Sequence, residues 1–155
     1  MATKTVELKQ VQGITFAAKA GSNHWVIMDN HNPQFGGSSA GSTPKELVLM
    51  GLAGCTASDV IPILKKKRSP VMGFEIYVTG KEREEHPRIF TEIHVEYVVY
   101  GDGVDASDVE RAIELSTTKY CSVSAILKAS ATLTHSFRIE PTSKMSERPL
   151  AVPVA

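Results

Sequence analysis

The polar and apolar pattern of the N-terminal part of the chain predicts a small antiparallel sheet. Residues 5–11 alternate polar and apolar side chains with the period of two that is typical of a strand. Residues 14–19 and 24–29 are rich in the branched and aromatic side chains that favour strands. Residues 20–23, Ala-Gly-Ser-Asn, have the composition of a turn. We therefore expect three consecutive strands, followed by a Gly- and Ser-rich loop over residues 30–42.

A long helix is predicted to begin at Thr43. Thr43 suits the N-cap, Pro44 suits the first helical position, and Glu46 stands where a capping box needs its carboxylate. The helical pattern extends to about Lys67, and its first turns are apolar on nearly every side. An amphipathic helix would keep one polar side, so we expect this helix to be buried almost all round.

The second half of the chain predicts a mixture of strands and helices. Residues 91–100 alternate so that four apolar side chains share one face: Ile93, Val95, Tyr97 and Val99. The remaining elements are strands at residues 74–79 and 131–139, a helix from Asp105 with apolar positions up to Ser116, and a short helix from Cys121. Strands and helices do not alternate as they do in a doubly wound parallel sheet, so the order indicates the α+β class.

The predicted architecture is one of antiparallel sheets around the long buried helix. We expect a single domain over residues 1–140, with residues 141–155 as a flexible tail rich in proline and in polar and small side chains. One sheet covers only one side of a helix that is apolar all round. A second copy of the chain is the natural cover for the other side, which predicts a homodimer.

Composition and charge narrow the classes of function. The 17 basic residues balance the 17 acidic ones, so neither nucleic acid nor a membrane surface is an expected partner. The N-terminus has no apolar signal-peptide core, and we expect a cytoplasmic protein. The five histidines are scattered and form no repeated pattern with cysteine. Neither a metal site nor a cofactor is expected.

Cys55 and Cys121 are the two cysteines of the chain. A permanent structural disulfide is improbable in the reducing cytosol, and their wide separation excludes a CxxC motif. Two readings remain open from the residues alone. Either the fold brings the thiols together as a redox centre, or each cysteine is a small core residue, which is a common fate for free cysteine.

Two segments carry a resemblance to a known family. Residues 41–56, from Gly41 through Cys55 to Thr56, resemble the cysteine helix of the OsmC/Ohr family of osmotically inducible proteins and organic hydroperoxide resistance proteins. Residues 119–124, around Cys121, resemble that family's second cysteine motif. The gap, the order of elements and the chain length agree as well, so that the resemblance covers roughly residues 8–140.

The resemblance implies an intertwined α+β homodimer with active sites at the subunit interface. It implies that Cys55 is the attacking thiol, which becomes a sulfenic acid when it reduces an organic hydroperoxide. Cys121 is then the resolving thiol that forms a disulfide with Cys55, and a small-molecule or protein-bound dithiol is the reductant. A thiolate is the nucleophile in such chemistry, and a helix dipole at Cys121 is expected to favour the thiolate there.

The chain differs from the peroxidase members at two helper positions. Those members carry an arginine that activates the cysteine, and the nearest match here is Lys19; they also carry a glutamate directly after the helix-opening proline, where this chain has Lys45, with Glu46 one position later. Lys19 and Glu46 are therefore candidate helpers, although Glu46 also has its predicted capping role. A non-catalytic small-molecule-binding protein of the OsmC-like type is the alternative function.

Overall fold

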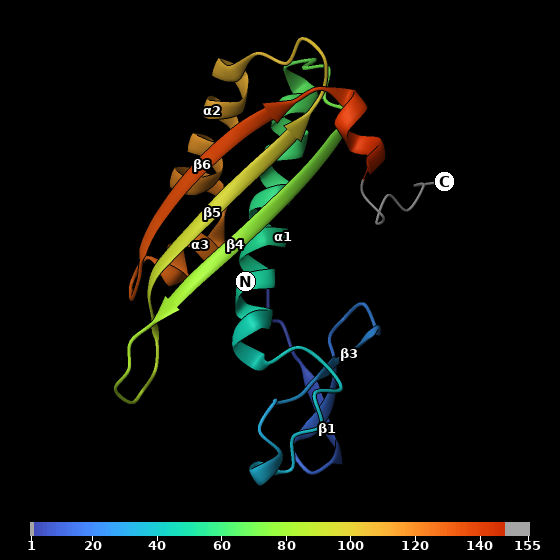
Figure 1. The fold of residues 1–155 in the computed structure, drawn as a ribbon, viewed down its shortest axis with the longest axis vertical. Coiled ribbons are helices and arrows are strands. Elements are labelled where there is room, and N and C mark those ends of the chain that lie inside the picture. The colour runs from blue at the N-terminus through green and yellow to red at the C-terminus, as the bar shows by residue number, and fades with distance from the viewer. Residues whose placement is uncertain (1, 148–155) are drawn as a thin grey trace. The chain divides into compact units, whose positions relative to one another are not determined.

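The computed structural model describes residues 2–147, and the chain divides into two compact units, Met1–Val48 and Leu49–Ala155 (Figure 1). We call these the N-terminal unit and the C-terminal unit and describe each by itself. The single domain predicted over residues 1–140 stays a prediction. Residues 142–147 of the predicted tail form a short 3-10 helix, and residues 148–155 lie outside the described part of the chain.

The N-terminal unit contains the predicted three-stranded meander. Strands β1 (Glu7–Gln12), β2 (Thr15–Lys19) and β3 (Trp25–Met28) form an antiparallel sheet in the order β1-β2-β3. Leu8 pairs with Ala18 and Ala17 pairs with Ile27. A short 3-10 helix, Pro33–Phe35, lies within the loop that follows β3.

The loop after β3 is tied to the buried carboxylate of Asp29. One carboxylate oxygen accepts hydrogen bonds from the hydroxyls of Thr15 (2.9 Å) and Ser38 (2.6 Å) and from the backbone N–H groups of Ser38 (3.1 Å) and Ala40 (3.0 Å). The other oxygen accepts from the N–H of Asn30 at 2.6 Å. The Ser38 hydroxyl first, and the backbone N–H groups with it, hold the pKa of Asp29 far below its usual range despite burial. The Gly- and Ser-rich segment is therefore an ordered loop.

Helix α1 (Pro44–Lys66) begins as the sequence predicts. The backbone N–H of Thr43 donates to the Glu46 carboxylate at 2.7 Å, and the N–H of Glu46 lies 3.3 Å from the Thr43 hydroxyl that accepts its hydrogen bond. The predicted capping box is confirmed.

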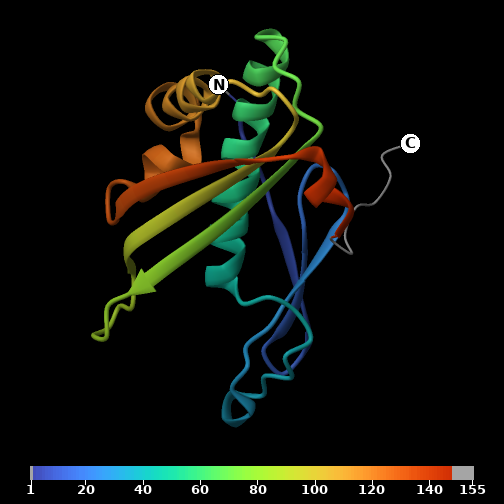
Figure 2. The same cartoon turned by 45° about the horizontal axis from the view of Figure 1, so that its top comes forward.

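The C-terminal unit is a three-stranded sheet covered by helices on one face (Figures 1 and 2). The strands are β4 (Gly73–Glu82), β5 (Phe90–Tyr100) and β6 (Thr132–Glu140), in the order β4-β5-β6. The helical segments are α1 from Leu49 onward, α2 (Ala106–Leu115), a π-helical turn η2 (Ser116–Tyr120) and α3 (Ser122–Leu127). The α+β class is confirmed.

Strand β6 departs from the antiparallel arrangement that we expected. It pairs with β5 in parallel, with Val95 opposite His135 and Tyr97 opposite Phe137. The chain between these two strands contains α2, η2 and α3, which carry it back across the sheet. Parallel neighbours need a crossover of that kind, and here the crossover contains the second cysteine.

The alternating face of β5 and one stripe of α1 form the core of the C-terminal unit. Tyr97 and Val99 of β5 belong to the same buried cluster as Leu52 and Leu64 of α1. The prediction that α1 is buried almost all round is wrong for the single chain. Its buried positions recur every fourth residue: Leu52, Thr56, Val60 and Leu64. One sheet covers one side of the helix, so Met50 and Ile61 remain 52% and 45% exposed.

Helix α1 is also long and apolar enough, by length and composition alone, to cross a membrane. The core helix of a globular protein can have the same length and composition. The packing of Leu52, Val60 and Leu64 into the cluster that contains β5 fits a core helix.

The Asp29 contacts generate a prediction about stability and pH. The Asp29→Ala variant is expected to melt at a lower temperature than the wild type at pH 7 because it loses the carboxylate that accepts five hydrogen bonds. A carboxyl group whose pKa is depressed by folding stabilises the protein above its unfolded pKa of about 4 and loses this contribution as the pH falls below that value. The difference in Tm between wild type and variant should therefore shrink below about pH 4.

Thermal unfolding monitored by circular dichroism from pH 3 to pH 7 checks this prediction. Asp102→Ala, which changes an exposed aspartate, is the matched control. Equal losses in the two variants, or a difference that does not depend on pH, would contradict the role given to Asp29.

Candidate active site

Both cysteines lie in the C-terminal unit. Cys55 is half-buried on α1, and Cys121 is buried at the start of α3. The backbone N–H of Cys121 donates to the carbonyl of Ser116 at 2.8 Å, and its sulfur accepts from the N–H of Ser124 at 3.3 Å. The thiol thus occupies the N-cap position of α3, where a serine or threonine side chain is usual.

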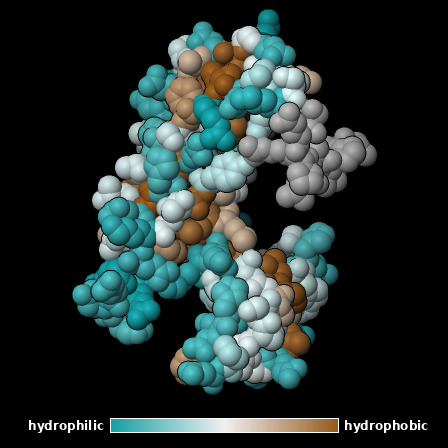
Figure 3. Space-filling view, viewed as in Figure 1, coloured by the Kyte–Doolittle hydropathy of each residue, from teal (hydrophilic) through white to brown (hydrophobic). Residues whose placement is uncertain are grey.

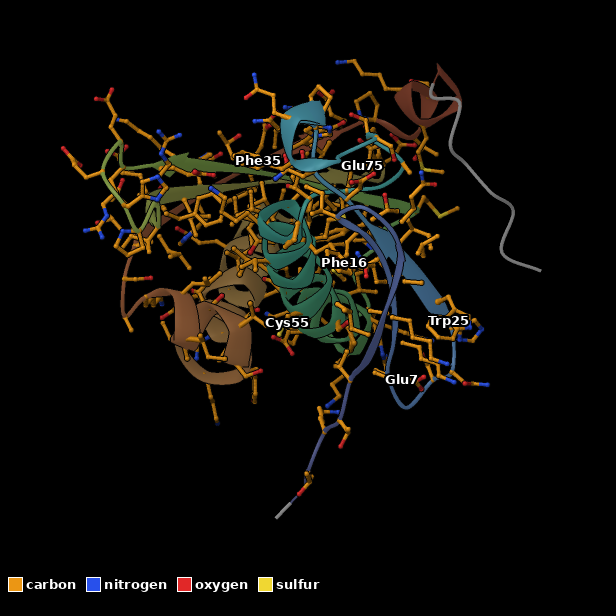
Figure 4. The ribbon with its side chains drawn as sticks, turned by 90° about the horizontal axis from the view of Figure 1, so that it is seen from below. Glu7, Phe16, Trp25, Phe35, Cys55 and Glu75 are labelled. Atoms are coloured by element: carbon orange, nitrogen blue, oxygen red, sulfur yellow. The ribbon has the colours of Figure 1, made fainter. Side chains whose placement is uncertain are left out.

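The two thiols are close enough for each to affect the ionisation of the other. The thiols come close, although they are distant in sequence, because the segment η2–α3 lies against α1, and Figure 4 shows Cys55 between α1 and that segment. Ser122 lies on the same side, with its hydroxyl oxygen 4.0 Å from the Cys55 sulfur. The structure therefore brings together the two residues that the sequence singled out.

The surroundings of Cys55 favour its thiolate. Partial burial opposes ionisation of Cys55. Hydrogen bonds from the backbone N–H of Val123 and from the side chains of Cys121 and Ser122 outweigh burial, so that the pKa of the Cys55 thiol is below its usual value. The Asp59 carboxylate, one helical turn further along α1, acts in the opposite direction.

The surroundings of Cys121 favour its protonated form. Burial raises the pKa of the Cys121 thiol, and the neighbouring Cys55 adds to this effect, although the hydrogen bonds from Ser124 oppose it. The helix dipole was expected to favour the Cys121 thiolate, but burial outweighs any such effect and the pKa of this thiol is raised. Burial is the largest influence on the pKa of Cys121, and Cys55 is the cysteine that ionises more readily.

A buried polar network adjoins the thiols, and the sequence analysis did not find it. Thr56 follows Cys55 in α1, and its hydroxyl lies 2.7 Å from the Tyr97 hydroxyl and 2.9 Å from the Ser116 hydroxyl. The Ser116 hydroxyl donates to the Asp59 carboxylate at 2.9 Å. Ser116 was grouped with apolar positions because of its helical spacing. The signal available in the sequence was the polar group Thr56, Ser58 and Asp59, which interrupts an otherwise apolar stretch over residues 47–64.

Lys19 and Glu46, the candidate helpers, belong to the N-terminal unit and have partners there. The Lys19 ammonium group lies 3.0 Å from the Asn23 side-chain oxygen, 3.5 Å from the Glu7 carboxylate and 4.9 Å from the centre of the Trp25 ring. Glu7 and Trp25 are labelled in Figure 4. Glu46 caps α1. These contacts account for both side chains, and a role for either at Cys55 stays a prediction.

The arrangement can perform two-electron thiol chemistry. Cys55 offers a thiolate that is held by donors, and Cys121 offers a protonated thiol close to it. A neighbouring thiol can capture a sulfenic acid as a disulfide before further oxidation. Among residues 2–147, no group of three or more His, Cys, Asp or Glu side chains could hold a metal ion.

Known proteins resemble this chain in sequence and in fold. The OsmC-like protein family model matches residues 36–136. Protein YhfA of Escherichia coli strain K12 is 40% identical over 132 residues, which is 85% of this chain and 95% of YhfA. A hypothetical protein from Aquifex aeolicus VF5 is 38% identical, with a TM-score of 0.80 over 91% of this chain and 98% of that protein.

A more distant structure has the same fold. An organic hydroperoxide resistance protein from Elizabethkingia anophelis aligns with a TM-score of 0.66 over 90% of this chain and 98% of that protein, at 14% identity. At this identity the likeness is one of fold alone.

The unequal surroundings of the two thiols predict unequal reactivity. In the folded protein, Cys55 is expected to react with iodoacetamide with a pH midpoint below that of an ordinary cysteine (about 8.5), because its thiolate is stabilised by hydrogen bonds. Cys121 should react more slowly and with a higher midpoint. Peptide mapping by mass spectrometry after timed alkylation between pH 5 and pH 10 measures both rates.

Ser122→Ala is expected to raise the Cys55 midpoint because it removes a donor. The protein unfolded in urea is the control, since the two cysteines should react alike there. Equal midpoints in the folded protein would show that the donors at Cys55 have no effect on its ionisation.

Proposed function

Because the chain belongs to the OsmC-like protein family, we propose that it reduces organic hydroperoxides by thiol chemistry. Cys55 is the attacking thiol and Cys121 the resolving thiol in this proposal. The observation that carries it is the closeness of the two thiols, together with the stabilised thiolate at Cys55. The likeness in fold to an organic hydroperoxide resistance protein supports the choice of substrate class.

The first step oxidises Cys55. Its thiolate attacks one oxygen of the peroxide, the O–O bond breaks, and Cys55 becomes a sulfenic acid. The leaving alkoxide takes a proton from water and departs as an alcohol. Two electrons pass from the sulfur to the peroxide. The Val123 N–H and the Ser122 hydroxyl stabilise the thiolate from which this step starts.

The second step forms a disulfide. The Cys121 sulfur attacks the Cys55 sulfenic acid, the new S–S bond forms, and the hydroxyl group leaves with the Cys121 proton as water. A small or protein-bound dithiol then reduces the disulfide by thiol–disulfide exchange and supplies two electrons. This restores both thiols and completes the cycle.

The apolar surroundings of the thiols favour an organic peroxide. Cys55, Val123 and Leu127 pack against the buried cluster that contains Leu52. Alkyl groups of a substrate gain free energy on leaving water for such surroundings, whereas hydrogen peroxide has no apolar part to bury.

We also propose a homodimer that acts in the cytoplasm and uses the open side of α1 as its interface. Met50 and Ile61 expose apolar surface on this helix. Figure 3 shows one face of the molecule, on which apolar side chains reach the surface among polar ones. Gly51 and Gly54 have open space where a side chain would stand. Small residues beside exposed apolar ones allow another helix to approach closely, and burying such surface is the usual source of association free energy.

Peroxide consumption tests the proposed activity. The wild-type protein is expected to consume cumene hydroperoxide with dihydrolipoamide as reductant, and faster than it consumes hydrogen peroxide. Cys55→Ser should reduce the rate to that of the uncatalysed reaction. Cys121→Ser should still form one equivalent of sulfenic acid at Cys55, which dimedone traps, but should not form the intramolecular disulfide.

Thr118→Ala removes an exposed hydroxyl near the site and serves as the control variant. The absence of turnover with every organic peroxide and dithiol tested would contradict the proposal. A protein that only binds a small molecule would show no turnover, and its stabilisation by that ligand would survive in Cys55→Ser.

Analytical ultracentrifugation tests the homodimer. Wild-type protein is expected to sediment as a dimer at micromolar concentration, and Ile61→Glu as a monomer, because a buried unpaired carboxylate opposes association. Met72→Glu changes another exposed apolar side chain, which lies outside α1, and is the matched control. A monomeric wild type would contradict this interface.

A further inference from the structure

A chain of four side chains joins α1, β5 and the π-helical turn behind the thiols. Tyr97, Thr56 and Ser116 are almost fully buried. Their hydroxyl oxygens lie 2.7 Å apart at the Tyr97–Thr56 step and 2.9 Å apart at the Thr56–Ser116 step. The chain ends where the Ser116 hydroxyl donates to Asp59. Three hydroxyls and a carboxylate in such a setting constitute a satisfied buried network.

The hydrogen bonds of this network all run in one direction. Each hydroxyl has one proton, and a charged carboxylate accepts only. Since Ser116 donates its proton to Asp59, it must accept from Thr56. Thr56 has then used its own proton and must accept from Tyr97. Burial raises the pKa of the Tyr97 phenol, which keeps the proton for this bond.

Ser116 connects this network to the resolving cysteine. It is the first residue of η2, and its backbone carbonyl accepts the N–H of Cys121 at 2.8 Å. Its hydroxyl is held by two residues of α1, the helix that carries Cys55. Ser116 therefore links the two cysteines: its backbone carbonyl holds Cys121, and its side chain is bound to the helix that carries Cys55.

A proton relay is the competing explanation of such a network, and the geometry opposes it. The chain ends at Tyr97, which is 1% exposed and donates into the network. A relay needs an outlet at each end, and no hydrogen bond of this network reaches either sulfur.

Activation of Cys55 does not explain Asp59 either. A carboxylate one turn away disfavours the Cys55 thiolate, so its presence works against the attacking thiol. Asp59 instead accepts the hydrogen bond of the Ser116 hydroxyl and so holds that side chain in place.

We propose that Ser116, held by Asp59 and Thr56, is a positioning residue that keeps the Cys121 thiol where it can form a disulfide with Cys55. The proposal rests on the redox pair of the proposed function. Loss of the Ser116 hydroxyl is expected to leave the oxidation of Cys55 intact and to disfavour closure of the disulfide, because small errors in the orientation of reacting groups are costly.

The test measures disulfide closure without any peroxide. The reduced protein is equilibrated with glutathione and glutathione disulfide, so that the protein dithiol becomes a disulfide while one glutathione disulfide is reduced to two glutathione molecules. In Ser116→Ala the equilibrium constant is expected to fall about tenfold, equivalent to about 30 mV in the potential of the pair. Thr118→Ala, which removes another hydroxyl of the same turn, should stay within about twofold of the wild type.

A second pair of variants separates the hydrogen bond from the charge. Asp59→Asn and Asp59→Ala both remove the carboxylate charge, but only asparagine keeps an oxygen that can accept from Ser116. Asp59→Ala should therefore resemble Ser116→Ala, and Asp59→Asn should lie closer to the wild type. Asp59 is only partly buried, so this pair carries the test if Ser116→Ala fails to fold.

The outcomes distinguish this proposal from the proposed function. A Ser116→Ala equilibrium constant equal to that of the wild type, or equal values for the two Asp59 variants, would overturn the positioning role. A wild type that closes the disulfide but consumes no peroxide would overturn the proposed function alone. With cumene hydroperoxide, formation of the sulfenic acid should keep its rate in Ser116→Ala, whereas disulfide formation should slow.

Discussion

The closeness of the Cys55 and Cys121 thiols is the constraint on which this account depends. It exists because α1 and the segment η2–α3 cover the same face of the sheet β4-β5-β6. Strand β5 gives this arrangement its core, and the parallel return to β6 makes the intervening chain cross the sheet. The crossover that the topology requires thus delivers the second cysteine to the helix of the first.

Two thiols in contact cannot be equivalent when their surroundings differ. Cys55 is partly exposed and receives hydrogen bonds from Val123, Cys121 and Ser122, so its negative charge is stabilised. Cys121 is 5% exposed, and burial favours its neutral form. A protonated thiol beside a thiolate can donate to it, so each state of the pair supports the other. The asymmetry matches the division of labour between an attacking and a resolving thiol.

Much of the fold could be predicted from local patterns. The meander β1–β3, the start of α1 at its capping box and the alternating face of β5 follow from side-chain period and turn chemistry. The parallel pairing of β6 could not be predicted, because strand order depends on contacts between distant residues. The all-round burial expected of α1 failed in the single chain because an apolar side chain does not reveal which layer will cover it.

The candidate site could be predicted only in part, because it too depends on contacts between residues that are distant in sequence. The two cysteines were identifiable because they are the only thiols of the chain. Which of them carries the charge depends on burial and on donors such as Val123, and neither is visible in the sequence. The network around Ser116 joins elements far apart in the chain, and a serine at a helical position gives no sign of its partners.

Oxidation of the reduced, folded protein with one equivalent of diamide, followed by peptide mapping under non-reducing conditions, tests the contact most directly. Diamide takes two electrons and two protons from a pair of neighbouring thiols and needs no peroxide. This account predicts one intramolecular disulfide between Cys55 and Cys121 and the loss of both free thiols in every chain. Thiols that stay free, or cross-links formed only between chains, would contradict it.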